Sequence, residues 1–323
     1  MSLNNIDVDM VFTYVDGYDD KFIKLKNKYI TDENKKCHPD IRDKGINEII
    51  FSVNSVIKYI PWIRTIFIIT SQNQIPPINR DLIKSGKVVI IDHKTIIEKK
   101  YLPTFNSDTI ESYLHNIPGL SEIFLYNNDD MIHFDYVYRS DIYKKENDKI
   151  NIKTINTYKN FNNVILLLQL YKHNLLTPLL TKANIPIHHI HNFQRINYTV
   201  DLLLKINPKL QLVNNHHTKI LRKSTLKYIE EKYSNKLEEI RRQRFRGTNY
   251  IKYLFFAMNI DNILNNNIIV NHSRDVYVKH FHYSKYKDNI FDDVFKKRPK
   301  FVCLNSMNYA FEDGLKQLMK QVI

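Results

Sequence analysis

The chain has only two cysteines and six glycines, and it has no long apolar run. Cys37 and Cys303 form no C-x-x-C pair, which argues against a disulfide framework and against a thiolate zinc site. The glycine-rich phosphate loops are excluded by the low glycine content, and no G-x-G-x-x-G sequence occurs. No signal peptide is visible, nor any run of the ~18 apolar residues that a membrane span needs. We therefore expect a cytoplasmic protein, soluble or attached peripherally to the inner face of the membrane.

The chain is rich in apolar residues and in positive charge. Hydrophobic residues make up 43% of its 323 residues and aromatic residues 12%, which predicts a folded protein. No linker interrupts the chain, so a single domain over residues 1–323 is expected. The net charge of +14 favours anionic partners: nucleic acid, an acidic polysaccharide, a nucleotide-activated substrate or an anionic membrane face. Charge alone does not choose among these partners.

Strand and helix patterns alternate over the first 140 residues. Continuous apolar runs predict strands at Val8–Val15, Thr65–Thr70, Val88–Ile91 and Ile123–Tyr126. Glu48–Ile60 has the apolar spacing of a helix. This alternation predicts an α/β fold with a mainly parallel, Rossmann-like sheet flanked by helices.

The pattern changes after residue 140. Lys144–Lys159 is polar and predicts a hairpin or loop, whereas Phe161–Leu180 predicts a buried helix or a lid. Further helices are expected at Ser224–Arg246 and Tyr250–Leu264, and strands at Val276–Ser284 and Phe301–Leu304. We expect an α/β core at 1–140, a mainly helical lid or acceptor subdomain at 141–300, and a short strand and helix returning to the core at 301–323.

The segment Leu102–Asp130 combines a short helix, an apolar strand and two terminal acids. Asp108 is predicted to cap the helix, with Glu111 completing a capping-box-like pair. The strand runs into Asp129 and Asp130 at its carboxyl end, where ligand sites of open α/β sheets gather. Two adjacent carboxylates there suit Mg²⁺ or Mn²⁺ bound to a phosphorylated substrate. The same residues also fit a plain helix–strand unit with a solvated acidic turn.

Two further groups of residues leave alternatives open. Asp16 and Gly17 follow the first strand and fit a nucleotide or metal contact, or else a tight turn with a solvated acid. His188, His189 and His191 fit a metal site or a general base, or else surface histidines. If this segment is extended, His189 and His191 share one face.

Four arginines, Arg241, Arg242, Arg244 and Arg246, precede Gly247. A guanidinium can hold a phosphate through two parallel hydrogen bonds. Cations before a glycine also suit the C-terminal end of a helix. We assign Arg241 and Arg242 to such a helix end and keep Arg244 and Arg246 as phosphate-binding candidates.

In their order along the chain, these segments resemble the Stealth family of hexose-1-phosphoryltransferases. The first block of that family resembles Ile6–Asp19, and the second resembles Ile41–Asp130, which contains LPTFNSDTIES and IPGLSEIFLYNNDDM. The third resembles Pro186–Arg195 and continues to Arg246, and the fourth resembles Phe301–Asn305. The resemblance implies a glycosyltransferase-A-like sheet that binds a nucleotide-sugar.

The resemblance also implies roles for individual residues. It implies that Glu111, Asp129 and Asp130 are active-site acids, and that the two aspartates hold Mg²⁺ or Mn²⁺. His188 matches the histidine of the family and is the expected general base, with Glu111 as the competing base or a metal ligand. The remaining expected site residues are Arg246 as a second cation, Asn106 and Asn305 as orienting amides, and Asp16 and Gly17 at the nucleotide-side turn.

The activity that the resemblance implies is transfer of a sugar-1-phosphate from a UDP- or CDP-sugar to a hydroxyl of an acceptor glycan. A UDP-hexose or UDP-N-acetylhexosamine donor and an oligo- or polysaccharide acceptor are expected as partners, in capsule or exopolysaccharide synthesis, with no nucleic acid. Two alternatives remain: a conventional glycosyltransferase that releases a nucleoside diphosphate, and a non-catalytic binder of acidic polymers. The latter predicts salt-sensitive binding without a metal.

Overall fold

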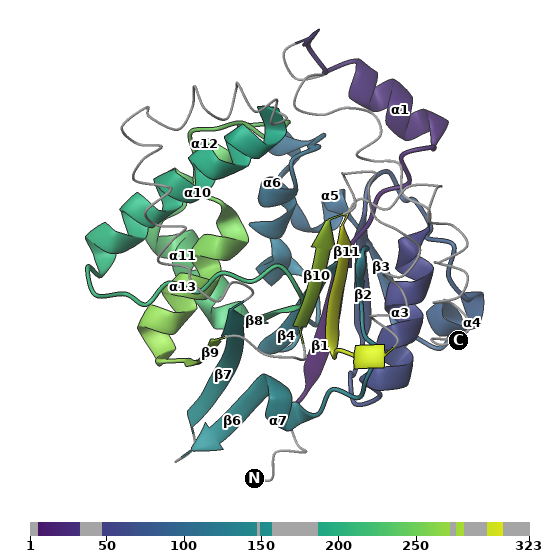
Figure 1. Cartoon of the computed structure of the whole chain (residues 1–323). Coiled ribbons are helices and arrows are strands. Elements are labelled where there is room, and N and C mark those ends of the chain that lie inside the picture. The colour runs from purple at the N-terminus through teal and green to yellow at the C-terminus, as the bar shows by residue number, and fades with distance from the viewer. Residues whose placement is uncertain are drawn as a thin grey trace.

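The computed structural model of the chain describes residues 6–32, 47–146, 149–156, 187–271, 276–280 and 296–305 (Figure 1). The helix or lid expected at Phe161–Leu180 lies outside these residues, as do Cys37 and the helix expected within 306–323.

The centre of the molecule is a five-stranded sheet in the order β3-β2-β1-β4-β8. Four of its strands are parallel, and β8 pairs antiparallel with β4. Their bounds are β1 Val8–Thr13, β2 Ile66–Thr70, β3 Val88–Asp92, β4 Ile123–Asn128 and β8 Lys219–Arg222. β1, β2 and β4 are buried along almost their whole length, which is why they read as continuous apolar runs. The expected α/β fold with a mainly parallel sheet is confirmed.

The direction of the chain through the sheet reverses between β1 and β4. From β1 the chain moves to β2 and β3 on one side, and it then crosses back to β4 on the other side of β1. Such a reversal leaves a crevice outside the carboxyl ends of the two strands, where open α/β sheets bind their ligands. In Figure 1 these ends point upward, toward α1 (Asp20–Asn27).

Helices cover both faces of the sheet. On one face α3 (Glu48–Tyr59) packs Ile49 and Val53 against Met10 and Ile68. On the other face the helices α11 and α13 pack with Phe124 of β4 in a second cluster. The remaining helices are α4 Arg80–Lys84, α5 His93–Ile96, α6 Ser107–Glu111, α7 Arg139–Ile142, α10 Ile187–Ile206, α11 Lys223–Lys232, α12 Ser234–Arg241 and α13 Tyr253–Asn265, with 3-10 turns at Lys99–Tyr101 and Leu114–Asn116.

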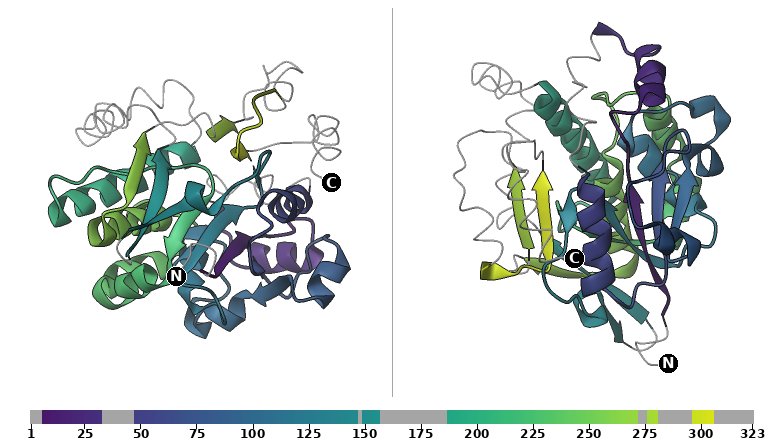
Figure 2. Two further views of the ribbon diagram at one scale, coloured as in Figure 1. Left: turned by 90° about the horizontal axis from the view of Figure 1, so that it is seen from below. Right: turned by 90° about the vertical axis from the view of Figure 1, so that its right-hand side faces the viewer.

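Two small sheets complete the described structure. β6 (Tyr143–Glu146) and β7 (Lys149–Asn156) form the hairpin expected from the polar pattern, and β9 (Ile268–Asn271) pairs with β7. β5 (Met131–Ile132), β11 (Phe301–Asn305) and β10 (Val276–His280) form the other sheet, on the same side of the central sheet as α3 (Figure 2). The described residues of region 141–300 therefore contain five strands beside their helices.

Three local predictions are corrected by the structure. The segment that holds His188 to His191 is the start of helix α10 and is not extended, so the shared face expected for His189 and His191 does not apply. The long charged helix is broken at Tyr233 into α11 and α12 and ends at Arg241. Strand β8 was not predicted, because its sequence Lys-Ile-Leu-Arg has two charges in four residues.

Candidate active site

The strand ends at the reversal bring together two of the predicted acidic turns. Asp16 and Gly17 follow β1, while Asp129 and Asp130 form the tight connection between β4 and β5. Tyr14 lies between the two turns. Burial is the main cause that raises the pKa of its hydroxyl, and the negative charges of Asp16 and Asp129 add to it. The structure thus confirms that the ends of β1 and β4 meet in one place.

Asp16 shapes its own turn. Its backbone N–H donates to Gln74 Oε1 at 3.0 Å, and Gln74 Nε2 donates to the Asp16 carbonyl at 3.0 Å. Asp16 Oδ1 accepts the N–H of Tyr18 at 2.9 Å, and Gly17 is buried. These contacts match the tight-turn interpretation and leave Asp16 Oδ2 as the atom that can face a ligand.

The Asp129–Asp130 turn holds two carboxylates that are unfavourable as anions. Its backbone is fixed by Ser52 of α3, whose hydroxyl donates to the Asp129 carbonyl. Desolvation raises the pKa of Asp129 well above its usual range, and the charges of Glu48 and Asp130 raise it further. Desolvation also raises the pKa of Asp130, against the opposing charge of Lys219. Both side chains keep part of their surface open to solvent. A bound cation would relieve this accumulation of negative charge.

The donor atoms at the turn fit a hard divalent cation. Asp130 Oδ1 and Asn127 Oδ1 are buried and have no hydrogen-bond partner among the described residues. His133 fixes the orientation of Asn127: His133 Nδ1 donates to the Lys300 carbonyl at 2.8 Å, so Nε2 can accept from Asn127 Nδ2 at 3.3 Å. Within the described residues no cluster of three or more His, Cys, Asp or Glu is arranged to hold a metal. The small number of protein oxygens at the turn suits Mg²⁺. This ion commonly takes one or two carboxylates and completes its coordination shell with water and substrate phosphate.

Glu111 lies on α6 and faces the end of β4. The hydroxyl of Tyr126 contacts Glu111 Oε1 at 3.1 Å, Asn128 Oδ1 at 3.0 Å and Thr13 Oγ1 at 2.9 Å. The side chain of Glu111 does not cap α6. The N-cap is Asn106, whose Oδ1 accepts the N–H of Asp108 at 3.2 Å. The predicted capping pair of Asp108 and Glu111 is therefore wrong, and Glu111 points toward the site.

The environment of Glu111 favours its protonated form. Burial raises its pKa to about 8, with a further contribution from the charge of Asp108. The hydrogen bonds lead to the same protonation state. Tyr126 has one proton, and Asn128 Oδ1 can only accept, so an ionised Glu111 would compete with Asn128 for that proton. A protonated Glu111 can donate to Tyr126 while Tyr126 donates to Asn128, which satisfies every oxygen.

Lys219 is a cation of the site that the sequence did not indicate. It lies on β8 directly opposite Tyr126, and its ammonium is 5.7 Å from the Tyr126 ring centroid. The residue is 8% exposed, and burial lowers the pKa of its ammonium, while the charges of Glu111 and Asp130 oppose this shift. Only the antiparallel pairing of β8 with β4 brings it there.

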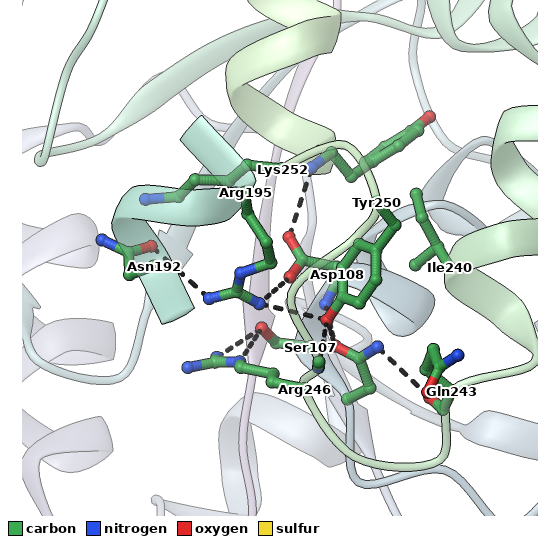
Figure 3. A network of polar contacts seen from close by, with 12 residues as sticks. Ser107, Asp108, Asn192, Arg195, Ile240, Gln243, Arg246, Tyr250 and Lys252 are labelled. Atoms are coloured by element: carbon green, nitrogen blue, oxygen red, sulfur yellow. Dashed lines mark hydrogen bonds and ion pairs between the residues drawn. The ribbon is translucent and has the colours of Figure 1, made fainter. Parts of the chain in front are cut away.

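A buried polar network supports α6 from the other side (Figure 3). Arg195 of α10 donates to Asp108 Oδ2 at 2.6 Å and to the Tyr250 hydroxyl at 3.1 Å. The second oxygen of Asp108 accepts the N–H of Tyr253 at the start of α13, at 3.2 Å. Asn106 donates from Nδ2 to the Gln243 carbonyl at 3.2 Å. The sequence did not predict the ion pair of Asp108 with Arg195. The side chains of Asn106 and Asp108 form hydrogen bonds to other residues of the protein.

Arg246 is held beside α6 by this network. Its guanidinium donates to Ser107 Oγ, with Nε at 3.1 Å, and desolvation lowers its pKa (Figure 3). Arg244 instead donates to the Pro103 carbonyl at 2.7 Å and lies over the Tyr29 ring. Arg241 pairs with Glu230 in the last turn of α12, and Arg242 with Glu238. Arg246 is thus the member of the cluster that contacts the first residue of α6.

Two predicted residues are placed by their backbone alone. His188 lies in the first turn of α10, the helix that supplies Arg195. Asn305 is the last residue of β11. Cys303, two residues earlier, lies beside the Asp129–Asp130 turn, where its thiol contacts Asp130 Oδ2 at 3.7 Å. The roles of His188 and Asn305 stay predictions.

Comparison with known proteins identifies the middle of the chain. Residues 42–151 match the family model for Stealth protein CR2, conserved region 2. We refer to these matched residues as the Stealth region. They include Asn106, Glu111, Asp129 and Asp130, and they cover the block expected at Ile41–Asp130 from residue 42 onward and extend beyond it to residue 151. The Stealth resemblance is confirmed there, whereas Asp16, His188, Lys219, Arg246 and Asn305 lie outside the match.

Similar proteins carry the names of phosphotransferases. The capsular polysaccharide phosphotransferase cps1A of Actinobacillus pleuropneumoniae is 44% identical over 134 residues, which is 40% of this chain and 36% of that protein. The capsular polysaccharide phosphotransferase fcs1 of Haemophilus influenzae is 44% identical over 130 residues, 39% of this chain and 35% of that protein. The exopolysaccharide phosphotransferase cps2G of Lactiplantibacillus plantarum is 42% identical over 125 residues, 39% of this chain and 36% of that protein. The chain thus matches little more than a third of the length of these curated relatives.

Solved structures are only distantly similar. Mouse xyloside xylosyltransferase 1 aligns over 93% of this chain and 98% of its own at 9% identity, with a TM-score of 0.34. The described helices include none with the length and apolar character needed to cross a membrane.

Proposed function

We propose that the chain transfers a sugar-1-phosphate from a nucleotide-sugar to a hydroxyl of an acceptor glycan, in capsule or exopolysaccharide synthesis. The acceptor oxygen forms a bond to the sugar-side phosphorus, and the bond from that phosphorus to the nucleoside phosphate breaks. A nucleoside monophosphate leaves, and the sugar keeps its anomeric C–O bond and configuration. The observation that carries the proposal is the contact of Glu111 with Tyr126 of β4, the strand that runs into the Asp129–Asp130 turn at the reversal between β1 and β4, inside a Stealth region.

The residues of the site fit the demands of phosphoryl transfer. Asp129 and Asp130 would hold Mg²⁺ or Mn²⁺, which when bound neutralises charge on the diphosphate. Arg246 supplies a second positive charge, and α6 fixes it through Ser107. The α6 network and the β4 end hold these groups on rigid elements, so the acceptor and donor meet in one orientation.

As the general base we propose Glu111. Its pKa of about 8 lies close to a working pH near neutrality, where a base both exists in its ionised form and accepts a proton readily. In this role Glu111 takes the proton of the acceptor hydroxyl. His188, which the resemblance implies, is the second candidate. The variants Glu111→Gln and His188→Gln distinguish the two candidates. Only the variant that lacks the base loses the pH dependence of kcat/KM that the pKa of the base causes.

Product analysis tests the reaction. The purified protein is incubated with UDP- and CDP-sugars, an oligosaccharide acceptor and Mg²⁺ or Mn²⁺, and the released nucleotide is identified. Release of UMP or CMP together with a phosphodiester product is expected. Release of UDP would show a conventional glycosyltransferase, and salt-sensitive glycan binding without any turnover would show a binding protein.

Asp130→Asn tests the metal turn within the same assay. We expect a loss of at least about a hundredfold in kcat/KM, because one charged oxygen donor is replaced by a neutral amide. The matched control is Asp81→Asn on α4, an exposed aspartate paired with Lys84. An Asp130→Asn variant with full activity would refute the assignment of the turn.

A further inference from the structure

The positive side chains around α6 have more hydrogen-bonding capacity than the described protein uses. Lys219 is nine-tenths buried and has three N–H donors, yet its one hydrogen bond is a long contact of 3.4 Å to the His217 carbonyl. Among the described residues its ammonium forms no ion pair. A buried cation with unused donors costs free energy, and an anionic ligand removes that cost.

Lys252 is a second cation with unused donors, at a position that is partly exposed. It is the residue before α13, and its backbone N–H is fixed by Thr199 of α10 at 2.8 Å. Within the described part of the chain its ammonium has neither a hydrogen bond nor an ion pair. Desolvation lowers its pKa to about 8, and the like charges of Arg195, Lys219 and Arg246 contribute to the shift.

The position of these lysines indicates which anion they would bind. Lys219 projects from β8 on the same side as Tyr126, next to the carboxyl ends of β4 and β1, where the Asp129–Asp130 turn lies. Lys252 precedes α13 and Arg246 contacts Ser107 of α6, and the charges of Lys219 and Lys252 both act on Glu111. The two lysines therefore gather around the candidate base, and Lys219 also acts on Asp130 of the turn. This arrangement suits a ligand with several negative oxygens in a row, such as a diphosphate.

We propose that Lys219 and Lys252 form an anion subsite that binds the diphosphate of the nucleotide-sugar donor. The subsite rests on the proposed function and assigns to it two residues outside the Stealth match. Both lysines would donate to phosphoryl oxygens, opposite the cation held by the aspartates. Repulsion among Lys219, Lys252 and Arg246 in the free protein is relieved when the diphosphate enters.

Binding of inorganic pyrophosphate tests the subsite independently of turnover. Affinity is measured by calorimetry with and without Mg²⁺ for the wild type, Lys219→Met, Lys252→Met and the double variant. Methionine keeps an unbranched apolar stem and removes the charge together with the N–H donors, which a buried site tolerates well. We expect each single variant to weaken binding roughly tenfold, and the double variant more.

The control is Lys87→Met. Lys87 is also a partly buried lysine whose pKa is lowered by burial, but it lies before β3, at the opposite end of the parallel strands, and donates to the Ile63 carbonyl. We expect its pyrophosphate affinity to equal that of the wild type. Thermal melting verifies that each variant is folded, and Lys252→Met, at a partly exposed position, carries the test if Lys219→Met does not fold.

The outcomes are distinct. Unchanged pyrophosphate affinity in the lysine variants, or no binding by the wild type, overturns the subsite. UDP should compete with pyrophosphate, and binding without such competition overturns its assignment to the donor. The proposed reaction fails on a different result, the absence of nucleoside monophosphate release by the wild type.

Discussion

At the scale of single residues, the proton on Glu111 matters both for the hydrogen bonds of the free protein and for the proposed reaction. In the free protein this proton satisfies the oxygens around the Tyr126 hydroxyl, and burial keeps it in place. Approach of positive charge to Glu111 favours its ionised form. Donor and cation binding would therefore prepare the base by lowering its pKa, so the site becomes competent only when it is loaded.

The pH dependence of stability reports this proton directly. Glu111 has an ordinary pKa near 4.5 and a folded pKa of about 8, so between these values the folded protein binds one proton more than the unfolded chain. Its contribution to stability is complete below about pH 4.5 and is lost as the pH rises through 8. Glu111→Gln should thus gain stability relative to the wild type over this window, by on the order of 4 kcal/mol.

Urea unfolding of both proteins at pH 4, 6 and 9 in EDTA measures this difference. Taking the difference between the two proteins cancels the buried histidines His133 and His217, whose pKa values of about 4 act with the opposite sign between pH 4 and 6.5. A difference in unfolding free energy that stays constant with pH would contradict a protonated Glu111.

The sequence was sufficient for some site residues because of what surrounds them. Asp129 and Asp130 follow an apolar run directly, and the rule on strand ends places such acids at a ligand site. Lys219 has no comparable signal. Its meaning depends on burial beside Tyr126, which lies 93 positions earlier in the chain and meets it only through β8 (219 − 126 = 93). A lysine in a short charged segment otherwise reads as a surface residue.

At the scale of elements, one ion pair joins the three helices that support the site. Arg195 extends from α10 to Asp108 on α6, and Asp108 also accepts the first N–H of α13. Thr199 adds a second connection, since it accepts the Lys252 N–H and donates to the Arg195 carbonyl at 2.6 Å. The position of Glu111 on α6 thus depends on helices far along the chain.

Removing one partner of this pair should be costly. Asp108→Asn leaves the buried Arg195 charge without its counter-charge, and both side chains are only 5% exposed. We expect a loss of about 3–5 kcal/mol in the free energy of unfolding, measured by urea denaturation. Asp81→Asn, which breaks an exposed pair with Lys84, should lose no more than about 1 kcal/mol. Equal losses in the two variants would rule out a structural role for the pair.

Elements were predictable where the pattern is local. The four parallel strands were found within one or two residues, since buried parallel strands are continuously apolar. The start of α10 was not, because its histidines and asparagine leave no clear helical stripe. The break at Tyr233 was missed for another reason, because charged pairs at helical spacing continue through the break. The packing of Tyr233 on Phe256 that accompanies the break is a tertiary contact, which the local pattern does not contain.

At the scale of the whole molecule, stability is concentrated in the middle of the central sheet. β1, β2 and β4 are covered by helices on both faces, whereas β6 exposes Lys144 and Glu146 in a peripheral hairpin. Backbone amides of β1, β2 and β4 should therefore exchange slowest with deuterium, and those of β6 among the fastest. Exchange mapped by mass spectrometry on peptides 8–13 and 143–146 checks this, and faster exchange in β1 than in β6 would contradict the described core.

The order of strands in this sheet has a consequence for dissecting the protein. The Stealth region at 42–151 includes β2 and β4, but the strand that lies between them, β1, precedes it in the chain. Expressed by itself, that region would have an open slot in the middle of its sheet, with two unpaired edges prone to self-association. A short peptide spanning residues 6–15 has the strand that fills the slot. We therefore expect that the protein can be produced as two separate fragments that form the complete central sheet only when they are mixed. Mixing the fragments would then switch the site on.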